Sequence, residues 1–112
     1  MKEKDRDIRY YINDIIESCD DILSFTAGMS FDEFAADKKT SKAVIRSLEV
    51  LGEAVKNLPV KFKSDLPAIP WKQMSGMRDR LIHEYFGVDK EMVWQVVKKD
   101  IPQILPLLKK IQ

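Results

Sequence analysis

Apolar residues recur at intervals of three and four along most of the chain, which is the spacing of one face of an α-helix. The first such stripe predicts a helix over about residues 5–26, with Gly28 as its stop signal. The stripe consists of Ile8, Ile12, Ile15, Cys19, Ile22 and Leu23. No segment alternates with period two over the length of a strand, so the pattern favours an all-α protein.

Capping signals predict two further helices in the first half of the chain. The stretch "SFDE" fits a capping box, with Ser30 as the N-cap and Glu33 reaching back to it, and predicts a short second helix. A third helix is expected to follow Asp37 or Thr40 and to end at Pro59. Its apolar positions are Val44, Leu48, Leu51, Val55 and Leu58.

Prolines mark the start of the second half. The segment "PVKFKSDLPAIP", residues 59–70, reads as a connector with room for one helical turn. Pro70 suits the first position of a fourth helix, and Trp71 provides an aromatic anchor. The stretch "YFGVD" is expected to end that helix.

Asp89 is the expected N-cap of a fifth helix, which should be kinked or broken near its middle by Pro102 and Pro106. Its apolar side holds Val93, Val97, Ile101, Ile104, Leu108 and Ile111. The whole chain, residues 1–112, is therefore expected to be one domain, an all-α helical bundle with four main helices plus a short helix.

Composition narrows the class of protein further. The chain has 19 Lys and Arg residues and 18 Asp and Glu residues, so it is nearly neutral as a whole. Binding to nucleic acid would therefore require a local basic patch, because there is no overall basic excess. Cys19 is the single cysteine, which excludes an internal disulfide and suits a reducing cytosol. Neither a signal peptide nor a membrane span is expected, because no long apolar run is present. These features predict a cytoplasmic protein with no membrane partner.

The stretch "MRDRLIHEYFGVD" contains the only histidine of the chain. At roughly 100° per residue, one narrow sector of the fourth helix forms its core stripe. That sector holds Met74, Met77, Leu81 and Tyr85. Arg78 falls roughly 40° from Met74, close to the same sector. A guanidinium there needs a partner or a wet cleft, because burying it unpaired costs several kcal/mol.

His83 is expected about 140° around the helix from Arg78, near Asp79 and with Arg80 one turn back. Simple interpretations exist for each of these groups. His83 can be a solvent-facing imidazole with no task, and Arg78 a side chain whose aliphatic stem packs on the bundle. Tyr85 can be a core aromatic with its hydroxyl at the rim.

An arginine near a histidine also suits the cleavage of a phosphodiester. An imidazole titrates near neutrality and can move a proton to or from an RNA 2′-hydroxyl or leaving oxygen. A guanidinium binds the phosphate with two donors and stabilises the charge that develops on it. The sequence offers no nucleophile with an obvious base, no phosphate-binding glycine loop and a poor ligand set for a metal, so no metal or other cofactor is expected.

The stretch "IPWKQMSGMRDRLIHEYFGVD", residues 69–89, resembles the signature of the HepT-like toxins, a branch of the HEPN ribonuclease superfamily. The family motif Arg-x4-His-x-Tyr is matched by Arg78, His83 and Tyr85, and its polar residue after the arginine by Asp79. The upstream stretch "LEVLGEAVKNLP" is similar to the third-helix pattern of that family. The resemblance covers nearly the whole chain.

The resemblance implies a homodimer in which two Arg-x4-His motifs share one cleft and cleave RNA without a metal. Arg78 and His83 would be the catalytic residues, with Asp79 and Arg80 in support. It also implies a type VII toxin–antitoxin system, whose antitoxin is a minimal nucleotidyltransferase of the MntA type. That partner would silence the toxin by transferring AMP to Tyr85.

Two other functional classes stay open at this point. One is a non-catalytic HEPN-like module that binds a nucleotidyltransferase or a nucleotide, with Arg78 serving only as a phosphate clamp. The other is a helical interaction protein with an amphipathic dimer face. A neighbouring nucleotidyltransferase gene would favour the ribonuclease and the binding module over this last class.

Overall fold

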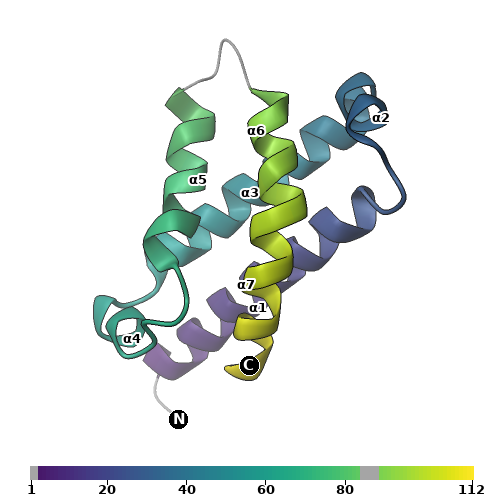
Figure 1. Ribbon diagram of the computed structural model, residues 1–112. Coiled ribbons are helices and arrows are strands. Elements are labelled where there is room, and N and C mark those ends of the chain that lie inside the picture. The colour runs from purple at the N-terminus through teal and green to yellow at the C-terminus, as the bar shows by residue number, and fades with distance from the viewer. Residues whose placement is uncertain (1–2, 84–88) are drawn as a thin grey trace.

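A computed structural model of the chain describes the backbone of residues 3–83 and 89–112, and the side chains of residues 7–77 and 89–112. The helices form two layers (Figure 1). Helices α1 (Glu3–Phe25) and α3 (Lys38–Asn57) pack against each other in one layer. In the second layer, α5 (Trp71–His83) packs on α3, and α7 (Ile101–Lys110) packs on α1. The described residues contain no strand, which confirms the all-α prediction.

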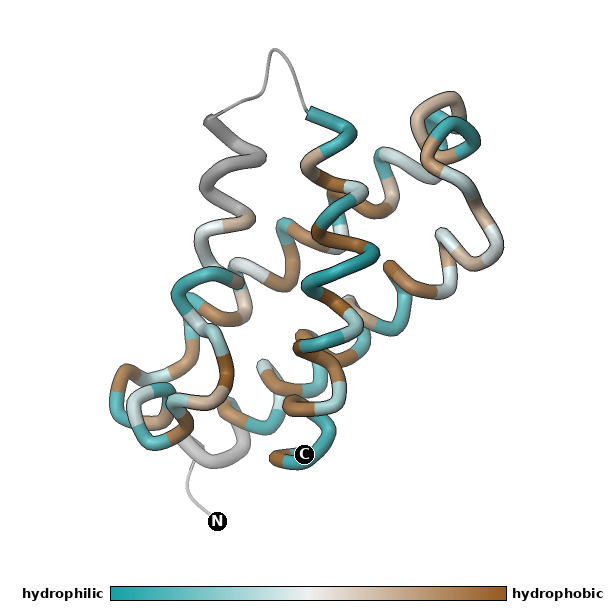
Figure 2. The backbone as a smooth tube through the Cα atoms, viewed as in Figure 1, coloured by the Kyte–Doolittle hydropathy of each residue, from teal (hydrophilic) through white to brown (hydrophobic). Residues whose placement is uncertain are grey.

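The predicted stripes form the core between the layers. On α1 the side chains of Ile12, Ile15, Cys19 and Ile22 are buried. The five apolar positions predicted for the third helix are also buried, four of them on α3 and the fifth, Leu58, at its C-cap. Figure 2 shows hydrophobic residues recurring along the helices rather than gathering in one segment. The hydrophobic effect thus holds the two layers together through one continuous core.

The turn after α1 forms as the sequence predicts. Gly28 has a φ of 75°, the left-handed conformation that glycine adopts without steric cost. The buried hydroxyl of Thr26 donates to the carbonyl oxygen of Ile22, 2.8 Å away. The Ile22 carbonyl oxygen also accepts from the Thr26 N–H at 3.3 Å, so Thr26 donates to it twice at the end of α1.

Helices α2 (Phe31–Ala36) and α3 begin at the predicted caps. In the capping box, Ser30 Oγ accepts from the Glu33 N–H at 3.1 Å, and the Glu33 carboxylate accepts from the Ser30 N–H at 3.0 Å. The Asp37 carboxylate accepts from both the N–H and the hydroxyl of Thr40, at 3.1 and 2.8 Å, and so caps α3. Both prediction and structure place α3 between Asp37 and Pro59.

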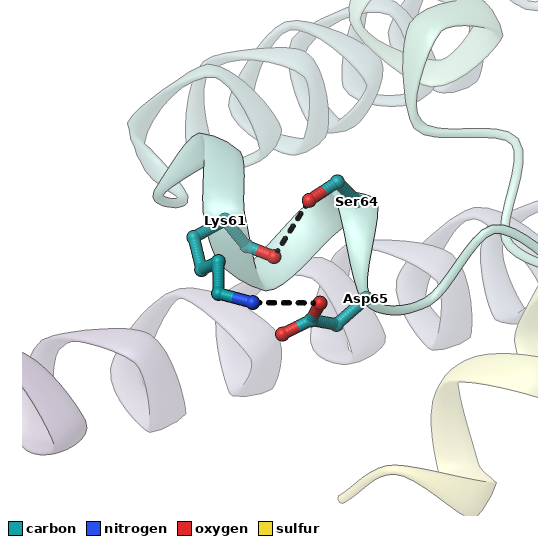
Figure 3. A network of polar contacts seen from close by, with 3 residues as sticks. All are labelled: Lys61, Ser64 and Asp65. Carbon is teal, nitrogen blue, oxygen red and sulfur yellow. Dashed lines mark hydrogen bonds and ion pairs between the residues drawn. The ribbon is translucent and has the colours of Figure 1, made fainter.

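The connector contains the one expected helical turn, α4 (Val60–Ser64). Its exposed face carries an ion pair between Lys61 and Asp65, with 3.2 Å between Nζ and Oδ1 (Figure 3). The Ser64 hydroxyl donates to the Lys61 carbonyl oxygen at 3.0 Å. On the inner side, the Lys63 ammonium donates to the Val55 carbonyl oxygen at 3.1 Å, where it stabilises the carboxyl end of α3.

The last helix departs from regular α-helical structure near its middle, where the sequence predicted a kink or break. It runs from α6 (Lys90–Gln95) through a single π-helical segment, Val96–Asp100, into α7. The Ile101 N–H donates to the Val96 carbonyl oxygen, five residues back, directly before Pro102. Proline has no N–H, and its ring collides with the carbonyl four residues earlier in a regular α-helix. The wider π turn accommodates that defect, and α7 continues through Pro106.

Candidate active site

Helix α5 carries the predicted motif, and its first two turns anchor it in the core. Trp71 is 8% exposed, and its indole Nε1 donates to the Leu66 carbonyl oxygen at 3.1 Å. Met74 and Met77 are also buried, which confirms the predicted core stripe as far as side chains are described. Helix α5 begins at Trp71, one residue later than expected. Pro70 lies just before the helix, and its carbonyl oxygen accepts a hydrogen bond from the Met74 N–H.

The backbone of the predicted site residues lies in the last two turns of α5. These residues are Arg78, Asp79, Arg80 and His83. On an α-helix, Cα positions five residues apart differ by about 140° around the axis and about 7.5 Å along it. The side chains of these four residues, and Tyr85 entirely, lie outside the described residues. The helical placement of the motif up to His83 is as predicted, and the roles of these residues stay predictions.

Helix α6 begins seven residues after His83, and two polar contacts hold its first turn. The Asp89 carboxylate accepts from the Met92 N–H at 3.1 Å, which confirms the predicted N-cap. The Lys90 ammonium donates to the carbonyl oxygen of Ala35 at 2.8 Å. Ala35 lies in the last turn of α2, where carbonyl groups lack intrahelical donors. This contact joins the start of α6 to the end of α2.

An aromatic cluster reinforces the same junction. The ring of Trp94 lies 5.0 Å from that of Phe34 and 6.3 Å from that of Phe31, measured between centroids. The Lys98 ammonium lies 4.8 Å from the Trp94 ring centroid, within the range of a cation–π contact. The helix before residues 84–88, α5, thus packs on α3, whereas the helix after them, α6, packs on α2.

The sequence interpretation did not identify Lys90 or Trp94 as part of this region. Lys90 and Ala35 are 55 residues apart, and no local pattern signals a contact between them. Trp94 follows a predicted core position, Val93, and its aromatic character was the only available signal.

Two chemical properties of the described residues bear on function. No group of three or more histidine, cysteine or acidic side chains among them is arranged to hold a metal ion. No helix in the described part of the chain is long and apolar enough to cross a membrane.

A helical bundle that carries an Arg-x4-His motif on one of its packed helices has the features of a small all-α ribonuclease. The model of the family described as ribonuclease HepT-like matches residues 15–111, and the chain belongs to that family. Membership confirms the expected family and the expected enzyme class.

Relatives match over nearly their whole length. A protein of Thermococcus cleftensis named "Probable ribonuclease HepT" is 47% identical over 112 residues, which cover 100% of this chain and 99% of that protein. A protein of Methanocaldococcus jannaschii named "Putative RNase MJ0127" is 51% identical over 106 residues, which cover 95% of this chain and 88% of that protein. No solved structure matches the chain.

Proposed function

We propose that the protein is a metal-independent endoribonuclease whose catalytic residues are Arg78 and His83. The observation that carries this proposal is the Arg-x4-His-x-Tyr motif on α5 of a chain that belongs to the ribonuclease HepT-like family. RNA is the substrate, and the protein acts as the toxin of a toxin–antitoxin pair.

The chemistry follows from the two side chains. The RNA 2′-oxygen attacks the adjacent phosphorus, its proton passes to an imidazole, and the bond from phosphorus to the 5′-oxygen breaks. The leaving 5′-oxygen takes up a proton, and the upstream fragment ends in a 2′,3′-cyclic phosphate. His83 handles protons, because an imidazole titrates close to neutral pH. Arg78 binds the phosphate and stabilises the negative charge that develops on it.

Asp79 and Arg80 support this pair. Asp79 precedes His83 by four residues, a spacing that brings side chains together on a helix. Its carboxylate would orient the imidazole and favour the protonated form. Arg80 precedes His83 by three residues and adds positive charge where the RNA phosphates bind.

A second copy of the chain completes the site. Positions 78 and 83 are separated by about 140° around one helix, so a single chain presents them on different sides. A two-fold axis close to α5 brings Arg78 of one copy toward His83 of the other. Light scattering at micromolar concentration should therefore report a dimer, and a monomer mass would contradict this part of the proposal.

The test compares the wild type with His83→Ala, Arg78→Ala and a control, Lys61→Ala, on exposed helix α4. Both motif variants should lose RNA cleavage by on the order of a hundredfold or more while keeping the helical circular dichroism signal. The control should cleave like the wild type. Chelator should have no effect, and mass spectrometry should detect cyclic phosphate ends.

EDTA-sensitive cleavage or a fully active His83→Ala protein would contradict the mechanism. Absence of cleavage by the wild type, with growth arrest retained in His83→Ala cells, would favour a non-catalytic binding module.

A further inference from the structure

The first half of α3 carries a stripe of four exposed basic side chains, which we call the α3 basic stripe: Lys38, Lys39, Lys42 and Arg46. At 100° per residue these positions fall within about 100° of one another around the helix axis. The buried positions of α3, such as Val44 and Leu48, lie on the opposite side. The stripe therefore faces away from the core over about 12 Å of helix length.

The local charge is unusual for a chain that is nearly neutral. Residues 38–47 contain four basic residues and no acidic one, so the remainder of the chain has 15 basic against 18 acidic residues. None of the four side chains forms an ion pair with another residue that the structure describes. The nearest acid in sequence, Asp37, has both carboxylate oxygens engaged by Thr40, and it also attracts the charge of Lys39.

Stability alone does not explain this arrangement. The amino end of a helix carries a partial positive charge, so acidic residues are favoured in the first turn and lysines are unfavourable there. Helix α3 has no acidic residue in its first turn and has Lys38 and Lys39 instead. Charged residues that oppose the helix dipole are expected where they serve binding rather than folding.

The stripe starts close to the first turn of α6, which follows the proposed active-site residues in sequence. Ala35, which accepts the Lys90 hydrogen bond, precedes Lys38 by three residues, a distance of at most about 10 Å along the chain. Lys90 itself follows His83 by seven residues. The stripe thus starts at the α2–α6 junction, which adjoins the segment that follows the motif, and runs away from it along α3.

The other end of the stripe is bounded by negative charge. Arg46 borders a hollow of about 270 Å³ between α1 and α3 whose lining includes the carboxylates of Asp14, Glu49 and Glu53. Glu49 and Glu53 continue the same outward side of α3. The run of basic residues on this side of α3 therefore ends at Arg46, and the next charged residue is Glu49.

We propose that the α3 basic stripe is the surface that binds the phosphate backbone of the RNA substrate outside the cleavage site. This inference rests on the proposed ribonuclease function. Each cation of the stripe can contact one phosphate of the strand, and each such contact releases counterions from the RNA. The contacts are electrostatic and carry no sequence information.

The experiment measures binding of a fluorescently labelled single-stranded RNA to the full-length His83→Ala protein, which does not cut the probe, as a function of salt. In this background the stripe variant Lys38→Gln/Lys39→Gln/Lys42→Gln is compared with Lys61→Gln/Lys109→Gln/Lys110→Gln. The control removes the same charge at α4 and the end of α7, far from α2 in Figure 1. A third variant replaces the three stripe lysines with arginine.

Each phosphate contact to a single strand contributes about 0.7 to the slope of log affinity against log salt. The glutamine variant of the stripe should lower that slope by about 2 and weaken binding at least tenfold near 0.15 M salt. The control should change affinity by less than about twofold, and the arginine variant should bind like the parent. Thermal melting should show the glutamine variant to be at least as stable as its parent, because it removes charges that oppose the helix dipole.

Equal affinity and equal salt slope in the stripe and control variants would overturn the inference. The inference would also be overturned if the stripe variant bound RNA unchanged but lost binding of the nucleotidyltransferase partner. That result would assign the stripe to a protein interface. The proposed function is judged separately, by cleavage in proteins that keep the lysines. With His83 intact, the stripe variant should raise KM and retain kcat, whereas His83→Ala should remove kcat.

Discussion

The ammonium of Lys90 donates a hydrogen bond to the carbonyl oxygen of Ala35 across 2.8 Å, which joins two helices that are far apart in sequence. The bond places a positive charge at the carboxyl end of α2, where the helix dipole favours it. It also holds the first turn of α6, seven residues after His83. The contact therefore links the start of α6 to the end of α2.

Replacing Lys90 with methionine should destabilise this junction. The variant keeps most of the aliphatic packing but leaves a partly buried carbonyl without its donor, which should lower the free energy of unfolding by about 1–2 kcal/mol. Lys61→Met is the control, because its exposed ion pair should contribute less than about 1 kcal/mol. Urea denaturation of both variants measures the difference, and equal stabilities would contradict a structural role for the Lys90 bond.

The Ser30–Glu33 capping box should contribute measurably to stability. Ser30→Ala removes the oxygen that accepts from the Glu33 N–H and should cost about 1 kcal/mol. Ser64→Ala is a matched control, because the Ser64 hydroxyl donates to the Lys61 carbonyl within a turn and caps no helix. If both alanine variants unfold at the same urea concentration as the wild type, the cap has no energetic role.

The same box predicts the direction of a pH effect. The backbone N–H of Ser30 and then its side chain hold the pKa of Glu33 below its ordinary value of 4.5. A carboxyl whose pKa is lower in the folded state stabilises the fold above its unfolded pKa and loses that contribution as pH falls through the folded pKa. The difference in the free energy of unfolding between the wild type and Glu33→Gln should therefore shrink as the pH falls below about 4.5.

Local sequence signals were sufficient for most of the fold. The capping residues Ser30, Asp37 and Asp89 and the stop at Gly28 all act within four residues of the feature that they specify. Such signals are visible without tertiary information, because the bonds that they describe are made inside one turn.

Other features depend on contacts or alternatives that a sequence does not display. Pro102 shows where regular α-helical bonding must fail, but a kink, a break and a π turn all satisfy that condition. The π turn at Val96–Asp100 is the outcome. The bond from Lys90 to Ala35 likewise joins positions with no local pattern in common. At the site, the spacing of Arg78 and His83 predicted their place on one helix, and their chemistry remains the proposal above.

Cys19 should be unreactive in the folded protein. Its side chain is fully buried on α1, and burial, with a smaller contribution from the Asp20 carboxylate, raises the pKa of the thiol to about 12. A thiol that stays protonated is a poor nucleophile. Ellman's reagent at pH 8 should therefore react with Cys19 of the native protein only as fast as the protein unfolds around it. After denaturation the reaction should be immediate. Rapid stoichiometric reaction of the native protein would contradict this placement.

The same pKa predicts a loss of stability in alkali. The thiol holds its proton more tightly in the folded state than in the unfolded state, so its contribution is complete below the unfolded pKa of about 9. That contribution is lost as pH rises from about 9 toward 12. Cys19→Ala has no group to ionise, so its stability should fall less than that of the wild type over this interval.

The proposed regulation by AMP transfer to Tyr85 gives the last prediction. Each AMP attached to the Tyr85 oxygen would add a negative phosphodiester and a bulky base two residues beyond His83 in sequence. The added phosphate would compete with RNA for the arginine of the motif, and the nucleotide would occupy the cleft. If the protein is the proposed toxin, co-expression with a nucleotidyltransferase encoded beside it should therefore add one or more AMP masses at Tyr85 and suppress growth arrest. Tyr85→Phe should remain toxic beside that partner, whereas Tyr10→Phe, which alters a tyrosine that is 65% exposed on α1, should be neutralised like the wild type. An unmodified Tyr85 in a neutralised complex would mean that the partner inhibits by binding alone.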